Sequence, residues 1–351
     1  MRKRRRQWLG TAVIAVVLAL LFWRTSRSPD WKQFSWPEVW SLLIHASRFW
    51  LTAAVVFTYS SYLIRAYRWK FFLDPFKPSS LSVLFTGQIL GFSAVYLIGR
   101  PGELVRPGYI ARWEGVPFAS QLAILVLERL YDLVAMALLF GLALYFEPTH
   151  SKGAGVGQTL HRMHQGAVAV LLGTLAMVAL LAVYRFRAEA IIRWAAKKLH
   201  FLPAKLRRIL SNVARSFAEG LDVIRNWKDL TASVVCTALL WAVNISVFWF
   251  VFQSLGGALA DLSWWVAAIC TFCAGVGLVI QLPGVGGGFQ LAMLFALKQL
   301  FQIPAGSATS AALLLWLAIM MPCVLLAGVL LIYGGLSFKK LKAMAEEEAA
   351  R

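Results

Sequence analysis

The sequence predicts an all-α membrane protein, a polytopic helical bundle that occupies residues 1–351 as a single integral membrane domain. The first observation is composition, because 60% of the 351 residues are hydrophobic and only 15% are charged, whereas soluble domains carry about 25% charged residues. The second is the recurrence of segments that are apolar on all sides and need lipid to cover them. The third is a net charge of +19 whose basic residues stand in short runs beside these segments, as cytoplasmic loops do.

The strong basic charge does not by itself indicate a nucleic-acid partner. Its 35 Lys and Arg against 16 Asp and Glu flank apolar stretches instead of forming one basic face. Anionic lipid headgroups are the expected counter-charge for such runs. We therefore predict membrane lipids as partners and no nucleic acid.

The first apolar segment, residues 7–23, follows a basic run at residues 1–6 and resembles a signal peptide. Arg24 follows it directly, in place of an Ala-x-Ala cleavage site. We interpret it as an uncleaved first span with Trp8 and Trp23 at the two membrane interfaces. A Trp-rich stretch comes next and predicts an interfacial helix that begins near Pro37.

Several further apolar segments are interpreted as membrane spans by their length and composition. They cover residues 49–64, 118–146, 166–184, 231–253 and 308–333. Two other segments, 81–98 and 264–301, are apolar but rich in Gly, and are predicted to be broken, re-entrant segments. Residues 185–230 hold eleven Lys and Arg against four acids in helical periodicity, which indicates amphipathic helices on the cytoplasmic membrane surface.

Basic loops face the cytoplasm, and this rule gives the direction in which each span crosses the membrane. The basic regions are residues 1–6, 65–80, 99–117, 185–230 and 334–351. All of them fall on one side only if residues 81–98 enter the membrane and return on the same side. This topology puts both termini in the cytoplasm.

The order of segments suggests two repeated units. One runs from 49–64 through the broken 81–98 to 118–146, and the other from 231–253 through 264–301 to 308–333. The two units begin on opposite sides of the membrane, as inverted repeats do in many transporters. Because the units share no residue-level similarity, the repeat is a hypothesis from topology.

Three ionisable residues stand inside the apolar helix 118–146, namely Glu128, Arg129 and Asp132. Each costs about 2.5–3.5 kcal/mol at a helix centre unless it is paired or faces water. Glu128 and Asp132 are four apart and share one helix face, so one can hold Arg129 while the other takes a second partner. The alternatives are a substrate path through the membrane and a salt bridge that fixes helix packing.

Arg100, Glu103, Arg106 and Arg112 follow the first broken segment and form a second candidate site. Proline and glycine free backbone N–H groups there, and arginines present forked donors that match phosphate. A site for a lipid phosphate and an ordinary basic cytoplasmic loop are equally compatible with this spacing.

Two helix-breaking turns are candidate gates, because unwound backbone at membrane depth is tolerated where it lines a cavity or is buried. Their residues are Pro101 and Gly102 in the first turn, and Pro283, Gly284, Gly286 and Gly287 in the second. A turn without a ligand role explains the second one equally well, and no Lys-Ser or Lys-Thr follows it as in a P-loop.

No cofactor or metal site is predicted. All four cysteines, Cys236, Cys270, Cys273 and Cys323, stand in apolar segments, where thiols behave as small hydrophobic groups. His150, His161 and His164 fall in a predicted outer loop and are interpreted as solvated. Asn244, Gln281 and Lys298 either line a pathway or bond neighbouring helices.

A set of motifs resembles the lysylphosphatidylglycerol synthase transmembrane-region family, also called flippase-like proteins. The motifs are Arg65-x-x-Arg68-Trp69, the run Gly99 to Arg106, Arg112-x-x-Gly115, Leu127-Glu-Arg-Leu-x-Asp132, Phe217-x-x-Gly220-Leu221, Trp241 and Pro283-Gly284-x-Gly286. The resemblance covers nearly the whole chain. One position departs from it, since Gln290 stands where glutamate often follows the glycine turn.

The resemblance implies a protein that moves modified phospholipids between leaflets, with relatives in polyprenyl-phosphate sugar pathways. The aminoacyl-transferase half of bifunctional members is not expected here, so we predict no enzyme activity. The leading hypothesis is a lipid flippase or scramblase for an anionic phospholipid, a modified phospholipid or a polyprenyl-phosphate-linked lipid. The alternatives are a membrane-embedded transferase in lipid-linked sugar metabolism and a small-solute transporter. A homo-oligomer and a separately encoded lipid-modifying enzyme remain open as partners.

Overall fold

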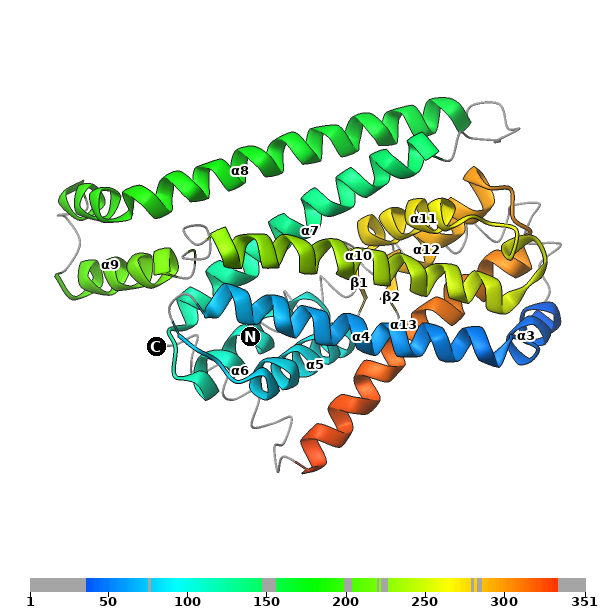
Figure 1. The fold of residues 1–351 in the computed structure, drawn as a ribbon, viewed down its shortest axis with the longest axis horizontal. Coiled ribbons are helices and arrows are strands. Elements are labelled where there is room, and N and C mark those ends of the chain that lie inside the picture. The colour runs from blue at the N-terminus through cyan, green and yellow to red at the C-terminus, as the bar shows by residue number, and fades with distance from the viewer. Residues whose placement is uncertain are drawn as a thin grey trace, which may run out of the picture.

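The computed structural model describes residues 36–74, 77–146, 156–198, 204–219, 221, 227–278, 281–282 and 286–333. These residues form an elongated bundle of helices, with α8 and α9 along one side of it (Figure 1). The predicted first span, residues 7–23, and the basic tail lie outside the described residues.

The described chain is helical almost throughout. Its helices are α3 (Trp36–Ile44), α4 (Arg48–Leu73), α5 (Leu81–Ile98), α6 (Val105–Glu114), α7 (Phe118–Phe146), α8 (Val156–Lys198), α9 (Ala204–Glu219), α10 (Trp227–Leu255), α11 (Trp264–Gly277), α12 (Gly288–Phe295) and α13 (Ala305–Tyr333). Shorter turns are the 3₁₀ turns Arg100–Leu104 and Gly257–Leu259 and the π turn Ala296–Leu300. Two-residue strands, β1 (Gln281–Leu282) and β2 (Gly286–Gly287), pair antiparallel.

Several of these helices have the character of membrane spans. Among the described residues, four are long and apolar enough to cross a membrane, within Leu81–Ile98, His161–Ala195, Trp227–Leu255 and Ala305–Ile332. A fifth candidate joins α3 to α4, which meet at 81°. The helix with the ionisable trio, α7, is not in this set, although its 29 residues give it a length of about 43 Å.

Two predicted boundaries and one predicted break were wrong. The segment 81–98 is the continuous helix α5, and the break comes only after it, at Gly99. The segment 49–64 continues as α4 to Leu73, because its late arginines find carboxylate partners inside the bundle. The span 166–184 and the start of the 185–230 region form one helix, α8, of 43 residues, about 64 Å long and longer than the hydrocarbon core.

A first helical hairpin forms where α5 ends. Gly99 adopts φ 79° and closes α5, a conformation that side chains other than glycine disfavour. The 3₁₀ turn then reverses the chain and α6 returns along α5, so that Gly91 lies against Arg106 and Gly102 against the backbone of Ala94. Small residues permit this close approach of two backbones.

A second helical hairpin forms from α11 and α12. Ser263 caps α11 by accepting a hydrogen bond from the Val266 N–H at 3.2 Å. The strand pair turns the chain, and α12 returns with Gly288 and Ala292 against Gly277. Within the segment 264–301, the helix is thus interrupted between α11 and α12.

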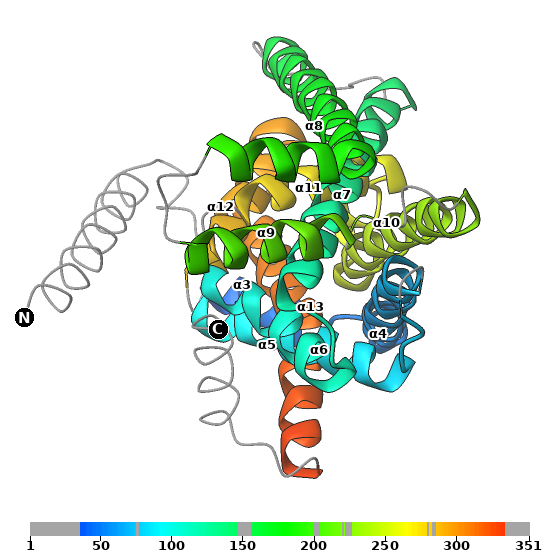
Figure 2. The same cartoon turned by 90° about the vertical axis from the view of Figure 1, so that its left-hand side faces the viewer.

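The two hairpins belong to units of opposite direction. Helix α4 runs antiparallel to α10, since the Ser47 N–H donates to Ser254 O at 2.7 Å at one end and Arg68 to Thr237 at 3.0 Å toward the other. Each hairpin also packs on the third helix of the other unit, α5 on α13 and α11 on α7. Figures 1 and 2 show α4 beside α10 in both views. This is the packing expected of the predicted inverted repeat.

Substitution of Gly102 or Gly277 by alanine is expected to destabilise the protein by about 1–3 kcal/mol, the usual cost of overpacking. A Cβ at Gly102 would lie 2.4 Å from backbone atoms of Ala94 and Val95, and one at Gly277 2.3 Å from Gly288 O. Thermal unfolding in detergent measures the effect. Gly141→Ala on α7 is the matched control, because nothing lies within 4 Å of its Cβ position, and it should be neutral or stabilising. Equal unfolding temperatures for all three variants would contradict the hairpin packing.

Candidate functional site

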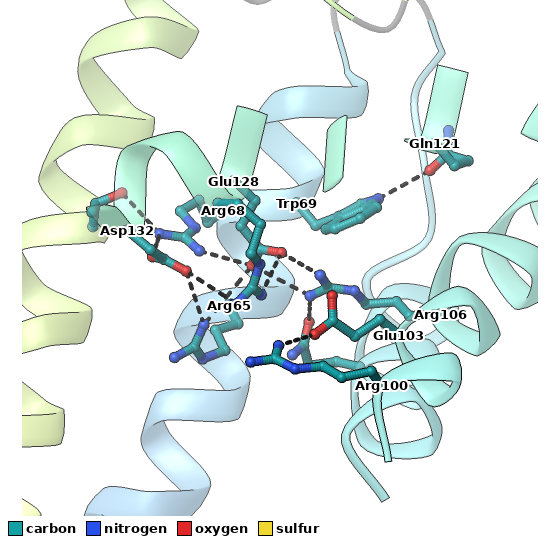
Figure 3. Close-up of polar contacts among 12 residues, drawn as sticks. Arg65, Arg68, Trp69, Arg100, Glu103, Arg106, Gln121, Glu128 and Asp132 are labelled. Carbon is teal, nitrogen blue, oxygen red and sulfur yellow. Dashed lines mark hydrogen bonds and ion pairs between the residues drawn. The ribbon is translucent and has the colours of Figure 1, made fainter. Parts of the chain in front are cut away.

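Helix α7 carries the acidic half of the site. Glu128 and Asp132, one helical turn apart, are 0% and 8% exposed. Both carboxylates face α4, and Glu128 also faces α6 (Figure 3). Carboxylates this deeply buried are stable as ions only with cationic partners.

Arg68 on α4 bridges both carboxylates. Its Nη2 donates to Glu128 Oε1 and its Nη1 to Asp132 Oδ1, each at 2.7 Å. The same Nη1 lies 3.0 Å from Thr237 Oγ1 on α10. Arg68 is fully buried, so this fork joins helices of both units.

Arg106 on α6 joins the first hairpin to α7. It donates to Glu128 Oε2 and, at 2.6 Å, to Gln88 Oε1 on α5. Its guanidinium lies over the Trp69 ring, 4.1 Å from the ring centre, where a cation–π contact adds to its stabilisation. The Trp69 indole is itself fixed, because its Nε1 donates to Gln121 Oε1 at 3.1 Å.

Two further arginines approach the carboxylates more loosely. Arg65 Nη1 lies 3.6 Å from Asp132 Oδ2 and 3.9 Å from Glu128 Oε1. Arg129 lies 3.3 Å from Glu128 Oε2 and 3.9 Å from Asp132 Oδ2, and its side chain is 41% exposed. These two arginines are therefore held less tightly by the carboxylates than Arg68, which lies at 2.7 Å from both.

We call the six side chains the arginine–carboxylate cluster. Its members are Arg65, Arg68, Arg106, Arg129, Glu128 and Asp132. Four guanidinium groups meet two carboxylates, so the cluster keeps two positive charges in excess. Buried charge without a counter-ion is costly, and an anion would lower that cost.

The tips of the two hairpins meet beside this cluster. Arg100 donates to Glu103 Oε1 and to the carbonyl of Leu278 at the end of α11, both at 2.5 Å. The side chains of Arg100 and Glu103 are 47% and 27% exposed. Figure 3 shows these two residues next to Arg106. Arg100 therefore links the turn of the first hairpin to the start of the turn in the second.

The predicted turn residues are placed in part. Pro101 and Gly102 lie in the 3₁₀ turn of the first hairpin, and Gly286 and Gly287 form β2 in the second. Pro283 and Gly284 lie outside the described residues.

The structure brings only part of the predicted arginine set into the cluster. Arg106 enters the cluster, whereas Arg112 is exposed on α6 and takes no part in it. The structure adds Arg65 and Arg68, together with Trp69, Gln88 and Thr237. For Arg65 and Arg68, the sequence offered one signal, their spacing of three residues, which puts both on one helix face.

A cavity of about 160 Å³ opens next to the cluster, between the two units. Arg65 lines one part of it, and Trp241 and Asn244 of α10 line another. The rest is mostly aromatic and aliphatic, including Phe92 and Phe289 from the two hairpins. The cavity is thus an apolar chamber with a cationic side.

Other predicted candidates lie elsewhere. His161 and His164 belong to the first turns of α8 and not to a loop. Within the described part of the chain, no group of three or more His, Cys, Asp or Glu could hold a metal ion. Cys270, Cys273 and Cys323 are buried as free thiols, as their apolar segments predicted.

Apolar helices, two helical hairpins and a charged cluster beside them define the chain as a multi-pass α-helical membrane protein with a polar site inside its bundle. It belongs to the lysylphosphatidylglycerol synthase TM region family, whose model matches residues 7–328. No curated protein matches the chain. The family is the membrane domain of synthase-like proteins, in keeping with a role that involves membrane lipids.

Proposed function

We propose that this protein moves a lipid with a phosphate-containing headgroup between the leaflets of the bacterial inner membrane, with both termini in the cytoplasm. The observation that carries the proposal is the positive excess of the arginine–carboxylate cluster inside an apolar bundle. An intramembrane ionisable cluster marks a substrate path by default. Guanidinium groups match phosphate oxygens in geometry as well as in charge.

The path follows from the exposure of the arginines. Arg100 and Arg129 have the most exposed side chains of this region, at 47% and 41%, and first meet the headgroup. Arg65 lies further in, at the cavity. The fully buried Arg68 keeps Glu128 and Asp132 in place. The lipid tails stay in the bilayer while the headgroup passes between the units.

The hairpin tips supply the gate. The Arg100 bond to the Leu278 carbonyl joins the two hairpins, and a phosphate competes for the same guanidinium. Headgroup binding would release Leu278 and allow the tips to separate. Opposed hairpins of inverted repeats give one opening to each side of the membrane, as alternating access requires.

Reconstitution tests this function directly. Purified protein in liposomes with fluorescent phosphatidylglycerol should let a membrane-impermeant quencher reach well over half of the label, because inner-leaflet lipid moves outward. Protein-free liposomes should remain near half. Failure to move any labelled anionic lipid, with or without an ion gradient, would overturn the proposal.

A further inference from the structure

The cavity between the units is a site in its own right. Its volume of about 160 Å³ is below the range of about 300–1,000 Å³ for pockets that enclose a whole drug-sized ligand. It is therefore suited to part of a lipid, with the remainder outside. Its walls come from both units, since Ser61 and Arg65 lie on α4 and Trp241 and Asn244 on α10.

Two residues that line this cavity carry a buried N–H donor without a hydrogen bond, although Arg65 Nη1 keeps its longer ion pair with Asp132 at 3.6 Å. Arg65 Nη1 and Trp241 Nε1 have no hydrogen-bond partner among the described residues, and both residues line the cavity. The hydroxyls of Thr58, Ser61 and Thr271, by contrast, are satisfied by carbonyls of their own helices. A buried donor without a partner costs about 1–3 kcal/mol. An acceptor group in the cavity would lie between these two side chains, which come from different units.

The charge of the side chains that line the cavity indicates which kind of acceptor group it can bind. None of the described residues that line it is acidic, and Arg65 is cationic. The nearest carboxylates, Glu128 and Asp132, are held by Arg68 at 2.7 Å. An amine in the cavity would meet a guanidinium and find no carboxylate to pair with, which disfavours it.

We propose that the cavity binds the phosphate of a lipid whose headgroup is net negative, between Arg65 of one unit and Trp241 of the other, and that it rejects headgroups with a net positive charge. This inference rests on the proposed function and names its substrate class. Phosphatidylglycerol fits this description. Its lysyl ester, which carries two amines, does not.

The test is lipid binding by the purified full chain in an uncharged detergent, measured by calorimetry. The ligands are short-chain phosphatidylglycerol, its lysyl ester, phosphatidylcholine and inorganic phosphate. Phosphatidylglycerol should bind at least tenfold more tightly than the other three. Equal binding of the lysyl ester would overturn the selectivity, and equal binding of inorganic phosphate would overturn the assignment to a lipid.

Two tryptophan variants locate the site. Trp241→Phe keeps the ring and removes the N–H, and should weaken phosphatidylglycerol binding about tenfold, as loss of one bond to a charged group does. Trp249→Phe is the matched control on the same helix, where the ring packs on Trp50 at 5.6 Å, and it should bind as the wild type does. Unchanged binding by Trp241→Phe overturns the proposed site. Selective binding without lipid movement in liposomes would refute the proposed function and leave this inference standing.

Discussion

Replacement of Glu128 by glutamine is expected to destabilise the bundle by about 3–5 kcal/mol, the cost of removing one partner from a buried ion pair. Glu128 is fully buried, and four guanidinium groups lie within 4 Å of its oxygens. Glutamine keeps the size and loses the charge, so Arg68 and Arg106 would remain buried with Asp132 as the remaining carboxylate of the cluster. The substitution also removes the ion pair between Arg106 on α6 and α7.

Thermal unfolding of the purified variant in detergent measures this loss. The control is Glu189→Gln on α8, because Glu189 pairs with Arg215 at 2.9 Å while both side chains are more than half exposed. Exposed ion pairs contribute little to stability, so this variant should unfold with the wild type. A wild-type unfolding temperature for Glu128→Gln would show that the cluster is not the electrostatic centre of the fold.

Composition was sufficient to predict the long helices. The apolar segment 118–146 coincides with α7, Phe118–Phe146, because a long apolar run without proline satisfies its backbone hydrogen bonds in lipid by forming a helix. The acidic residues of the site were predictable from the same helix. Ionisable side chains in such a run require a compensating partner, whichever residue provides it.

The partner itself could not be predicted. Arg65 and Arg68 mark the end of an apolar run, and loop arginines look the same in sequence as arginines that pair inside the bundle. Only the fold brings Arg68 to Glu128, which lies 60 residues away. The span was predicted to end at residue 64, and Arg65 and Arg68 were left out of the site, for the same reason. A long-range ion pair lets α4 continue beyond that residue.

Helical phase explains why only one of the two arginines on α6 joins the cluster. Arg106 and Arg112 are both on α6, and a separation of six residues puts them about 120° apart around the axis. One can face the bundle only if the other turns away. The spacing predicted two arginines, but the face that the hairpin buries was set by Gly91, which lies against Arg106.

Arg129→Ala is expected to slow lipid movement at least tenfold while the fold survives. Its side chain is 41% exposed and approaches the carboxylates at 3.3 and 3.9 Å, whereas Arg68 holds both of them at 2.7 Å. Loss of Arg129 therefore leaves Glu128 and Asp132 paired. It removes a guanidinium that a headgroup phosphate can reach, and a tenfold loss in rate corresponds to about 1.4 kcal/mol, within the value of one charge-assisted hydrogen bond.

The liposome assay and thermal unfolding together separate transport from stability. Arg129→Lys keeps the charge and loses the forked donors, so its rate should fall between those of wild type and Arg129→Ala. Arg215→Ala on α9, outside the cluster, should move lipid at the wild-type rate. If Arg129→Ala also moved lipid at that rate with its fold intact, the excess positive charge would serve only packing. The path would then have to bypass the cluster, because a headgroup that crosses between the units meets Arg129 before it can reach the cavity.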